Sequence, residues 1–505
     1  MMTMKQQHPW RINRLPPAWV WHFMLFLLLI ALLLVCFPDS PRLERDLDEG
    51  SHLMMAWLYH QGFSFYDQIY TDHFRMFNVL LSGWMDLFGF TIPVARAMVA
   101  MMSALLLWLL YWLLLVRSGV VAALAGVAMV LVSGAFLLHA GAIMQALPWI
   151  LFGLASLAAL RLAERIHNSL FFYLSAGLMA LAIQTKMFAL LMLPAMAWEL
   201  LRHGEAQGGE GRSMRAGILL RWGMTLLAAS LLLLAVTAPA LFDLTHLDAH
   251  TSYLFASHLG LEGLLPSKTL GRLLWSHAGD FPMVLLAVVG MVLVLRRGAS
   301  PDWFPLLWLI ANLAALGVMH PIWRQYYTLI SIPVIWLAAQ AIAEFQCAGS
   351  VSVKPLDGWL RQGVTVMLWL LLISFPMRID GAIHGMSQYD STLNSRLIAE
   401  LRRLAPETNW MVTDRPIYPF LAHINVVPEL AVTSSTLIYS GIQQDHTYVQ
   451  AIDHYHPKLV LLGRFRHLRR TLKAALAQRG YVRVFKGRDS WLYVRRDTAR
   501  PDFNP

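Results

Sequence analysis

The chain has 505 residues, of which 57% are hydrophobic and 14% are charged, and its mean hydropathy is +0.52. A soluble core does not need so much apolar sequence, so the composition excludes an ordinary soluble protein and indicates a polytopic membrane protein. The formal net charge is +10, but the basic residues fall in short connections and in the last part of the chain without a nucleic-acid-binding motif, so we expect no nucleic-acid partner.

About eleven apolar runs are long enough to cross a hydrocarbon layer of about 30 Å as helices that satisfy their own backbone hydrogen bonds. They cover residues 18–37, 93–115, 119–138, 146–163, 169–184, 187–201, 219–241, 281–296, 303–319, 326–344 and 359–377. The first run has no small-residue cleavage site after it, so we expect an anchor and not a cleaved signal peptide. The predicted fold is an all-α polytopic membrane domain over residues 1–378.

The orientation follows from the basic residues in the short connections, because Lys and Arg gather on the cytoplasmic side. Lys5, Arg11 and Arg14 precede the first apolar run. The basic residues on the same side are Arg117, Arg161, Arg165, Arg202, Arg212, Arg215, Arg296, Arg297, Lys354 and Arg361. The amino terminus is therefore predicted to be cytoplasmic, and an odd number of spans places both the first connection and everything after residue 378 outside.

The first outward connection, residues 38–90, is rich in ionisable and aromatic side chains. Asp48-Glu49 comes first, Tyr66-Asp67 follows, and the run from His73 to Asn78 closes it. Carboxylates beside a membrane are commonly just solvated, but a carboxylate in a cavity between helices can take the proton of an attacking hydroxyl. This connection is the candidate catalytic segment.

Two later segments place cations at the ends of apolar runs. Thr185-Lys186 interrupts two short runs, and a lysine at mid-bilayer costs roughly 2.5–3.5 kcal/mol, so a turn or a phosphate partner must accommodate it. The segment from His320 to Tyr327 adds Arg324 just before another run. Lys186 is thus a candidate for binding a phosphate group.

After residue 378 the apolar runs shorten to strand length and alternate with polar helical stretches, which predicts a separate α/β domain over residues 379–505. The predicted strands are Trp410 to Thr413, Lys458 to Gly463, Val482 to Phe485 and Trp491 to Val494, and the predicted helices are 392–404 and Arg466 to Arg479.

Taken in order, these segments resemble the GT-C glycosyltransferases, in the bacterial branch that is similar to protein O-mannosyltransferases and to the aminoarabinose transferase of lipid A. The residues that carry the resemblance are Asp48-Glu49, Ala56, Tyr66-Asp67, His73-Phe74-Arg75-Met76, Leu87-Phe88-Gly89, Arg96, Thr185-Lys186, His320 to Tyr327, Val412 to Pro416, Ser434-Ser435, Ser440-Gly441 and Pro457 to Val460. Each motif is short, and their order along nearly the whole chain gives the specificity.

The resemblance implies a multi-pass enzyme of the bacterial cytoplasmic (inner) membrane that moves a sugar from a polyprenyl phosphate to an acceptor hydroxyl on a lipid, a polysaccharide or a protein. It implies Asp48 as the general base, with Glu49 supporting it or binding substrate. A single displacement would invert the anomeric centre. The substrate-binding residues implied in this way are Tyr66, Asp67, His73, Arg75, Lys186, Arg324 and Tyr327.

The sequence departs from the family pattern at two places. Phe74-Arg75 stands where the family has Pro-Pro, and Gln145 stands near the position of a second acid. Asp46-Leu47-Asp48 also spells an Asp-x-Asp metal motif with His52, His60 and His73 nearby, but a hard cation needs more oxygen ligands than can be assigned. We therefore assign no metal ligand and no cofactor, and a divalent cation stays an open alternative.

Two other kinds of protein share a polytopic architecture. A transporter or flippase of a lipid-linked or polar solute is one alternative, although transporters commonly consist of two related halves with ionisable residues near the midplane. Here the acids gather near one face and no halves repeat. An inactive homologue that binds lipid is the other alternative, because the two departures fall in the candidate site.

Overall fold

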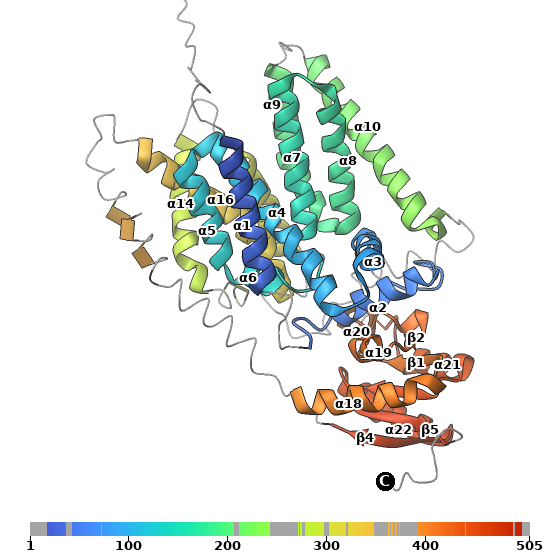
Figure 1. Cartoon of the computed structure of the whole chain (residues 1–505). Coiled ribbons are helices and arrows are strands. Elements are labelled where there is room, and N and C mark those ends of the chain that lie inside the picture. Colours follow the sequence, from blue (N-terminus) through green and yellow to red (C-terminus); the bar gives the residue numbers. More distant parts are fainter. Residues whose placement is uncertain are drawn as a thin grey trace, which may run out of the picture.

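In a computed structural model, the chain forms a bundle of helices with a small mixed sheet beyond one end of it (Figure 1). The structure describes residues 18–36, 43–71, 73–206, 212–242, 271, 273–274, 278–296, 302–319, 322–347, 362–363, 365–366, 369–370, 373, 391–439, 441–487 and 490–496.

The described elements up to residue 347 are all helical. The α-helices are α1 (Ala18–Cys36), α2 (Glu49–His60), α3 (Met76–Phe88), α4 (Ile92–Ser118), α5 (Val120–Val132), α6 (Gly134–His139), α7 (Pro148–Ile166), α8 (Ser169–Thr185), α9 (Leu193–Ala206), α10 (Arg212–Thr237), α14 (Phe281–Arg296), α15 (Phe304–Val318) and α16 (Tyr327–Cys347). Short 3-10 helices are η1 (Met187–Met192), η2 (Pro239–Phe242), η4 (Ala278–Asp280) and η5 (Arg324–Tyr326).

Several of these helices are suited to a bilayer, and the chain is a multi-pass membrane protein. Among the described residues, four stretches are both long and apolar enough to cross it: Ile92–Ser118, Met214–Thr237, Ala278–Arg296 and Tyr327–Glu344. Shorter apolar helices are Val20–Val35, Met76–Phe88, Val120–Val132, Ser169–Thr185 and Phe304–Val318. The count of eleven spans stays a prediction, and the last predicted span, 359–377, lies mostly outside the described residues.

Two predicted spans are interrupted. The run 119–138 divides into α5 and α6 at Ser133, whose hydroxyl accepts a hydrogen bond from the Phe136 backbone nitrogen at 3.3 Å and so begins a new helix. The run 187–201 begins as the 3-10 helix η1 because Lys186 has an extended backbone (φ −159°). The apolar runs therefore did not show where their helices break, and their membrane crossing stays a prediction.

Helices α7 and α8 pack against each other as an antiparallel pair (Figure 1). Between them His167 takes the left-handed conformation (φ 51°) that ends α7, and the Asn168 side chain accepts from the Leu170 backbone nitrogen at 2.8 Å to begin α8. As a result α7 leads away from one end of the bundle and α8 returns to it.

A buried ion cluster joins the helices near the C-terminal end of α7. One guanidinium nitrogen of Arg161 lies 2.9 Å from a Glu199 carboxylate oxygen of α9 and 2.8 Å from an Asp302 carboxylate oxygen just before α15. All three side chains are at most 6% exposed. Breaking such a buried group by removing one partner typically costs about 3–5 kcal/mol, so the cluster fixes how α7, α9 and α15 meet.

The last part of the described chain builds a five-stranded sheet with helices around it. The strands are β1 (Trp410–Thr413), β2 (Asn425–Val426), β3 (Leu459–Leu462), β4 (Tyr481–Lys486) and β5 (Trp491–Arg495). The helices are α18 (Ser391–Leu404), η7 (Ala405–Glu407), α19 (Ile417–Ala422), η8 (Pro428–Leu430), α20 (Ser435–Tyr439), α21 (Asp445–Tyr455) and α22 (Arg466–Gln478).

The strand order is β2-β1-β3-β5-β4, with β1 parallel to β2 and β3, and with β5 antiparallel to β3 and β4. All four residues of β3 are buried, as expected for a central strand that is covered on both faces. Four predicted strands and two predicted helices coincide with β1, β3, β4, β5, α18 and α22. The two-residue strand β2 was not predicted. The boundary at residue 378 stays a prediction.

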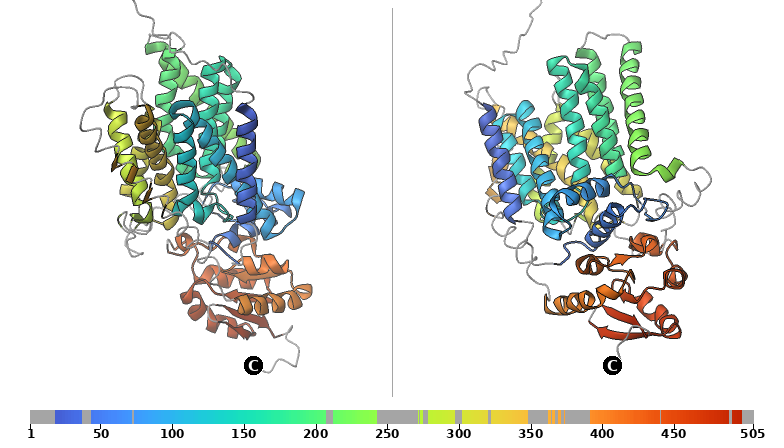
Figure 2. Two further views of the ribbon diagram at one scale, coloured as in Figure 1. Left: turned by 60° about the vertical axis from the view of Figure 1, so that its left-hand side comes forward. Right: turned by 45° about the vertical axis from the view of Figure 1, so that its right-hand side comes forward.

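Helix α2 lies between the bundle and the sheet-bearing part (Figure 2). A Cβ atom placed on Gly50 would lie 2.5 Å from the Ile417 backbone nitrogen, so only glycine lets α2 approach α19 this closely. The Trp57 indole nitrogen donates to the Asn425 side chain at 2.8 Å, and Arg415 pairs with Glu44 at 2.6 Å. Burial raises the pKa of Glu44 to about 7, although the nearby Arg415 opposes the shift.

Candidate functional site

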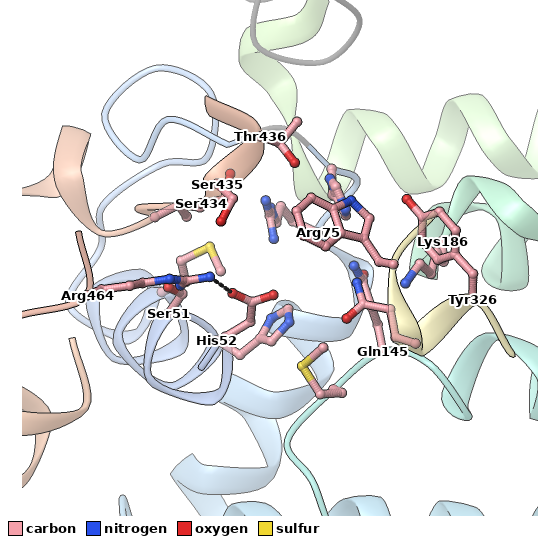
Figure 3. Close-up of a pocket in the computed structure, with 17 residues that line it drawn as sticks. Ser51, His52, Arg75, Gln145, Lys186, Tyr326, Ser434, Ser435, Thr436 and Arg464 are labelled. Atoms are coloured by element: carbon pink, nitrogen blue, oxygen red, sulfur yellow. Dashed lines mark hydrogen bonds and ion pairs between the residues drawn. The ribbon is translucent and has the colours of Figure 1, made fainter. Parts of the chain in front are cut away.

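One pocket lies where α2, the start of α3, the end of α8 and the sheet-bearing part meet (Figure 3). It holds about 760 Å³ of empty space, part of which is open to solvent. Its lining residues are Asp48, Ser51, His52, Met55, His73, Arg75, Met144, Gln145, Lys186, Trp323, Gln325, Tyr326, Val432, Ser434, Ser435, Thr436 and Arg464. Segments that are hundreds of residues apart in the sequence therefore share one cavity.

Asp48 occupies the N-cap position of α2, but its side chain makes no capping hydrogen bond. One carboxylate oxygen, Oδ1, accepts from Nη2 of Arg464 at 2.9 Å. The side chain is 33% exposed, and in the described part of the chain no partner is found for the other oxygen, Oδ2. The positive end of the α2 dipole also favours a negative charge here. The carboxylate is thus held at one oxygen while it lines an open pocket.

Glu49, the second predicted catalytic residue, has a buried carboxylate and does not line the pocket. Its Oε2 lies 2.8 Å from Nη2 of Arg96 and accepts from the Arg45 backbone nitrogen, also at 2.8 Å. Its Oε1 accepts from the Ile143 backbone nitrogen at 2.8 Å. These contacts tie α2 to α4 and to the segment before α7, which suits a supporting role.

Two predicted basic residues, Arg75 and Lys186, line the same pocket as Asp48, and both are more than nine-tenths buried. Arg75 stands at the start of α3, where one guanidinium nitrogen lies 3.5 Å from the Asn78 side-chain oxygen. Lys186 stands at the end of α8, and its ammonium lies 5.3 Å from the centre of the Phe188 ring. Buried cations in a partly closed cavity can stabilise an anionic group more than they would in water.

Two histidines line the pocket as well. His73 does so as predicted, and Tyr66 supports it by donating its hydroxyl hydrogen to the His73 carbonyl oxygen at 2.8 Å. His52 contacts the Asn78 side chain, and burial lowers the pKa of His52 to about 3, so its ring is neutral at physiological pH. In the parts of the chain that the structure describes, no group of three or more potential ligands gathers that could hold a metal ion.

The remaining predicted residues lie around the pocket. Asp67 is exposed and accepts from the Ser64 hydroxyl at 3.2 Å, and Tyr327 is buried at the start of α16 while its neighbour Tyr326 lines the pocket. Arg324 belongs to η5, but its side chain lies outside the part of the chain that is described.

Two further lining residues present polar atoms with no hydrogen-bond partner among the described residues. They are the Ser51 hydroxyl oxygen and Oε1 of Gln145, on side chains that are 4% and 3% exposed. Buried polar atoms are normally satisfied, so the hydrogen-bonding capacity of these two atoms is not used by the described residues. The sequence marked Gln145 only as a departure from the family, and gave no sign of Ser51.

Arg464 is the main residue that sequence reasoning missed. It lies two residues after the end of β3, and β1 and β3 are parallel, so their carboxyl ends lie at the same edge of the sheet. That edge also carries Arg415, which contacts Glu44. Since ligands of α/β folds bind beyond the carboxyl ends of parallel strands, a charged residue directly after the predicted strand 458–463 was a usable signal.

A scan against protein-family models gives no match to this sequence, and a search among curated proteins gives none either. Solved structures do match. The crystal structure of ArnT from Cupriavidus metallidurans bound to undecaprenyl phosphate has a TM-score of 0.62 at 13% sequence identity, and the match covers 94% of this chain and 98% of that chain. The same protein in the apo state gives a TM-score of 0.56 at the same identity and coverage.

A second kind of enzyme matches nearly as well. The Archaeoglobus fulgidus oligosaccharyltransferase, tethered with an acceptor peptide that contains the NVT sequon, has a TM-score of 0.54 at 14% identity, and the match covers 88% of this chain and 69% of that chain. Identities this low establish the fold alone. The chain therefore has the fold of the GT-C glycosyltransferases, to which both of these enzymes belong.

Proposed function

We propose that the protein is a glycosyltransferase that moves a sugar from a polyprenyl phosphate to an acceptor hydroxyl, with Asp48 as the general base. The observation that carries the proposal is one pocket lined by the Asp48 carboxylate together with two buried cations, Arg75 and Lys186. The likeness in fold to ArnT, whose crystal structure holds undecaprenyl phosphate, supports a lipid-linked donor.

The reaction needs one base and one site for the leaving group. The acceptor oxygen attacks the anomeric carbon, the bond from that carbon to the phosphate oxygen breaks, and the hydroxyl proton passes to the free oxygen of Asp48. The departing polyprenyl phosphate keeps the electron pair and gains charge, which Lys186 and Arg75 stabilise. A single displacement of this kind inverts the anomeric centre.

The other proposed roles follow from position. Glu49 supports Asp48 by fixing the start of α2 through Arg96. Tyr66 holds His73 at the pocket through the hydrogen bond to its carbonyl oxygen. Asp67, Tyr327 and Arg324 are proposed to contact substrate once the donor and the acceptor are bound.

The setting of the reaction is proposed to be the outer face of a bacterial cytoplasmic membrane. The basic connections predict a cytoplasmic amino terminus, and the pocket lies at the end of the bundle that the sheet-bearing part covers (Figure 2). Residues 379–505 would then form an extracytoplasmic α/β domain, and the acceptor would be an envelope lipid, polysaccharide or protein.

The test is release of the lipid carrier. Purified protein in lipid nanodiscs is mixed with undecaprenyl-phosphate-linked hexoses or pentoses and with envelope lipids, polysaccharides or proteins as acceptors. Free undecaprenyl phosphate is measured by mass spectrometry. We expect wild-type protein to release it and Asp48→Asn to lower the rate at least 100-fold, because general-base catalysis contributes about 10²–10⁴-fold.

Asp86→Asn is the matched control, because Asp86 is 42% exposed, pairs with His60 and lies outside the pocket. It should turn over like wild type. Equal turnover by Asp48→Asn would refute the assignment of the base, and a product with a retained anomeric configuration would refute the single displacement. Transport of the intact lipid-linked sugar across vesicles without cleavage would point to a transporter.

A further inference from the structure

The pocket has a wall that comes from the last part of the chain. This wall consists of Val432, Ser434, Ser435, Thr436 and Arg464, and it faces α2 and the start of α3 (Figure 3). The only charged residue of this wall among those described is Arg464, and its guanidinium reaches Asp48, 416 positions earlier in the sequence. The dashed line in Figure 3 marks this ion pair.

Arg464 is held in place from its own side of the pocket. The buried Asp414 carboxylate, just after β1, accepts from the backbone nitrogens of Gly463 and Phe465 at 2.6 and 2.9 Å. The Arg464 guanidinium also donates to the Thr433 carbonyl oxygen at 3.0 Å through Nη1. The backbone on both sides of Arg464 is therefore fixed to the sheet, and its side chain is only 11% exposed.

The ion pair with Arg464 makes the two carboxylate oxygens of Asp48 different from each other. Oδ1 accepts from Arg464, while Oδ2 has no partner in the described part of the chain. Other ionisable groups around Asp48 come from several elements: Asp46, His52, His73, Arg75 and Lys186. Among them Arg464 is the described cation in direct contact with the carboxylate, so it is the group that fixes the rotation of Asp48.

We propose that Arg464 is a positioning residue for the proposed reaction: it fixes the rotation of the Asp48 carboxylate and directs Oδ2 toward the acceptor hydroxyl. This inference rests on the proposed function. It also assigns the last part of the chain a direct role in the site, because the sheet carries the residue that orients the base.

The first measurement is turnover with the undecaprenyl-phosphate sugar that wild-type protein cleaves. Arg464→Gln keeps a hydrogen-bond donor but loses the charge, and we expect its kcat to fall at least tenfold while the KM for the donor stays within about twofold. Arg464→Lys restores the charge with a single donor group and should recover part of kcat. Arg466→Gln is the matched control, because Arg466 is exposed at the start of α22 and lies outside the pocket.

The second measurement does not depend on catalysis. Dicyclohexylcarbodiimide adds to protonated carboxyl groups, and the adduct on the peptide that contains Asp48 is quantified by mass spectrometry. Removing the guanidinium frees Oδ1, the carboxylate oxygen that it contacts, for reaction with the carbodiimide. At one fixed, mildly acidic pH we expect Arg464→Gln to label about tenfold faster than wild type, the size expected for one lost charge-assisted hydrogen bond. Arg464→Lys should lie between them, and Arg466→Gln should match wild type.

The outcomes separate the two proposals. If Asp48 labels equally fast in Arg464→Gln and in wild type, Arg464 does not hold Asp48 and the inference is overturned, whatever the turnover. A fall in kcat that Arg464→Lys does not recover, together with unchanged labelling, would mean that Arg464 only supports the fold. If wild type cleaves no donor while labelling rises as expected, the proposed function fails and the coupling of Arg464 to Asp48 is supported.

Discussion

Asp48 and Glu49 are neighbours in the sequence, yet their carboxylates have different surroundings. Successive side chains on a helix point about 100° apart, so at the start of α2 one carboxylate lines the pocket while the other is buried against Arg96. The first is 33% exposed and the second is fully buried. An acidic pair in a sequence therefore indicates where a site lies. Which of the two carboxylates is the candidate base depends on the direction of each side chain.

Replacing Glu49 tests this separation. Glu49→Gln leaves the buried Arg96 guanidinium without its carboxylate partner, and breaking a buried pair in this way typically costs about 3–5 kcal/mol. We expect a large drop in the free energy of unfolding, which is measured by thermal unfolding of the protein in detergent. Asp86→Asn breaks an exposed pair and should cost less than about 1 kcal/mol. Equal losses in the two variants would contradict the buried, supporting role of Glu49.

At the level of single residues, the sequence predicted part of the pocket. Asp48, His73, Arg75 and Lys186 were named through the order of their motifs and the resemblance to the family, and all four line it. Arg464 was not predicted as a pocket residue because it belongs to a part of the chain where charged residues are common. What brings it to the pocket is the docking of the sheet on α2, which depends on contacts between distant residues.

At the level of elements, the local sequence was most informative where a pattern was long. The buried run of β3 and the amphipathic helix α22 were predicted within a residue or two. The strand β2 has only two residues, too few to show any alternation, and it exists because it pairs with β1. The helices α19 and α20 are likewise short, with six and five residues, and were not predicted.

The segment before α2 and the end of β1 are joined by the Glu44–Arg415 pair, and this link has a pH dependence. Burial raises the pKa of Glu44 from 4.5 to about 7, so the folded protein binds the proton more tightly than the unfolded chain. The resulting stability is fully present below about pH 4.5 and is lost as the pH rises through about 7. The raised pKa of Asp46, about 6, acts in the same direction.

Glu44→Gln removes this titration. Wild-type protein should lose up to about 3 kcal/mol of unfolding free energy relative to Glu44→Gln as the pH rises from about 4.5 to 8. Thermal unfolding midpoints of both proteins in detergent, measured at several pH values, give the difference. A difference between the two proteins that does not change with pH would show that Glu44 titrates alike in the folded and unfolded states.

At the level of the whole molecule, the helices lie on one side of α2 and the sheet on the other (Figure 2). Composition predicted the membrane character of the chain, because apolar content is a property of long segments, and the boundary at residue 378 stays a prediction. It did not predict that the two parts share a pocket. Gly50 allows this close approach, and a single glycine does not stand out in a sequence with 32 of them.

The orientation in the membrane can be tested with two single cysteines. In a chain with Cys36→Ser and Cys347→Ser, Arg470→Cys lies on the exposed face of α22, and Ser169→Cys lies exposed at the start of α8, at the far end of the bundle from the pocket. We expect a membrane-impermeant maleimide to label Arg470→Cys in intact spheroplasts. Ser169→Cys should react only after permeabilisation. The reverse pattern would contradict an outward-facing pocket.

The long separation between Asp48 and Arg464 has a consequence for biosynthesis. Asp48 leaves the ribosome 416 residues before Arg464, so every transmembrane segment described here is made while the pocket still lacks one side. A prematurely terminated product would carry the anchoring helices without the closing arginine. The pocket is therefore complete only near the end of translation, once the sheet that carries Arg464 has been made.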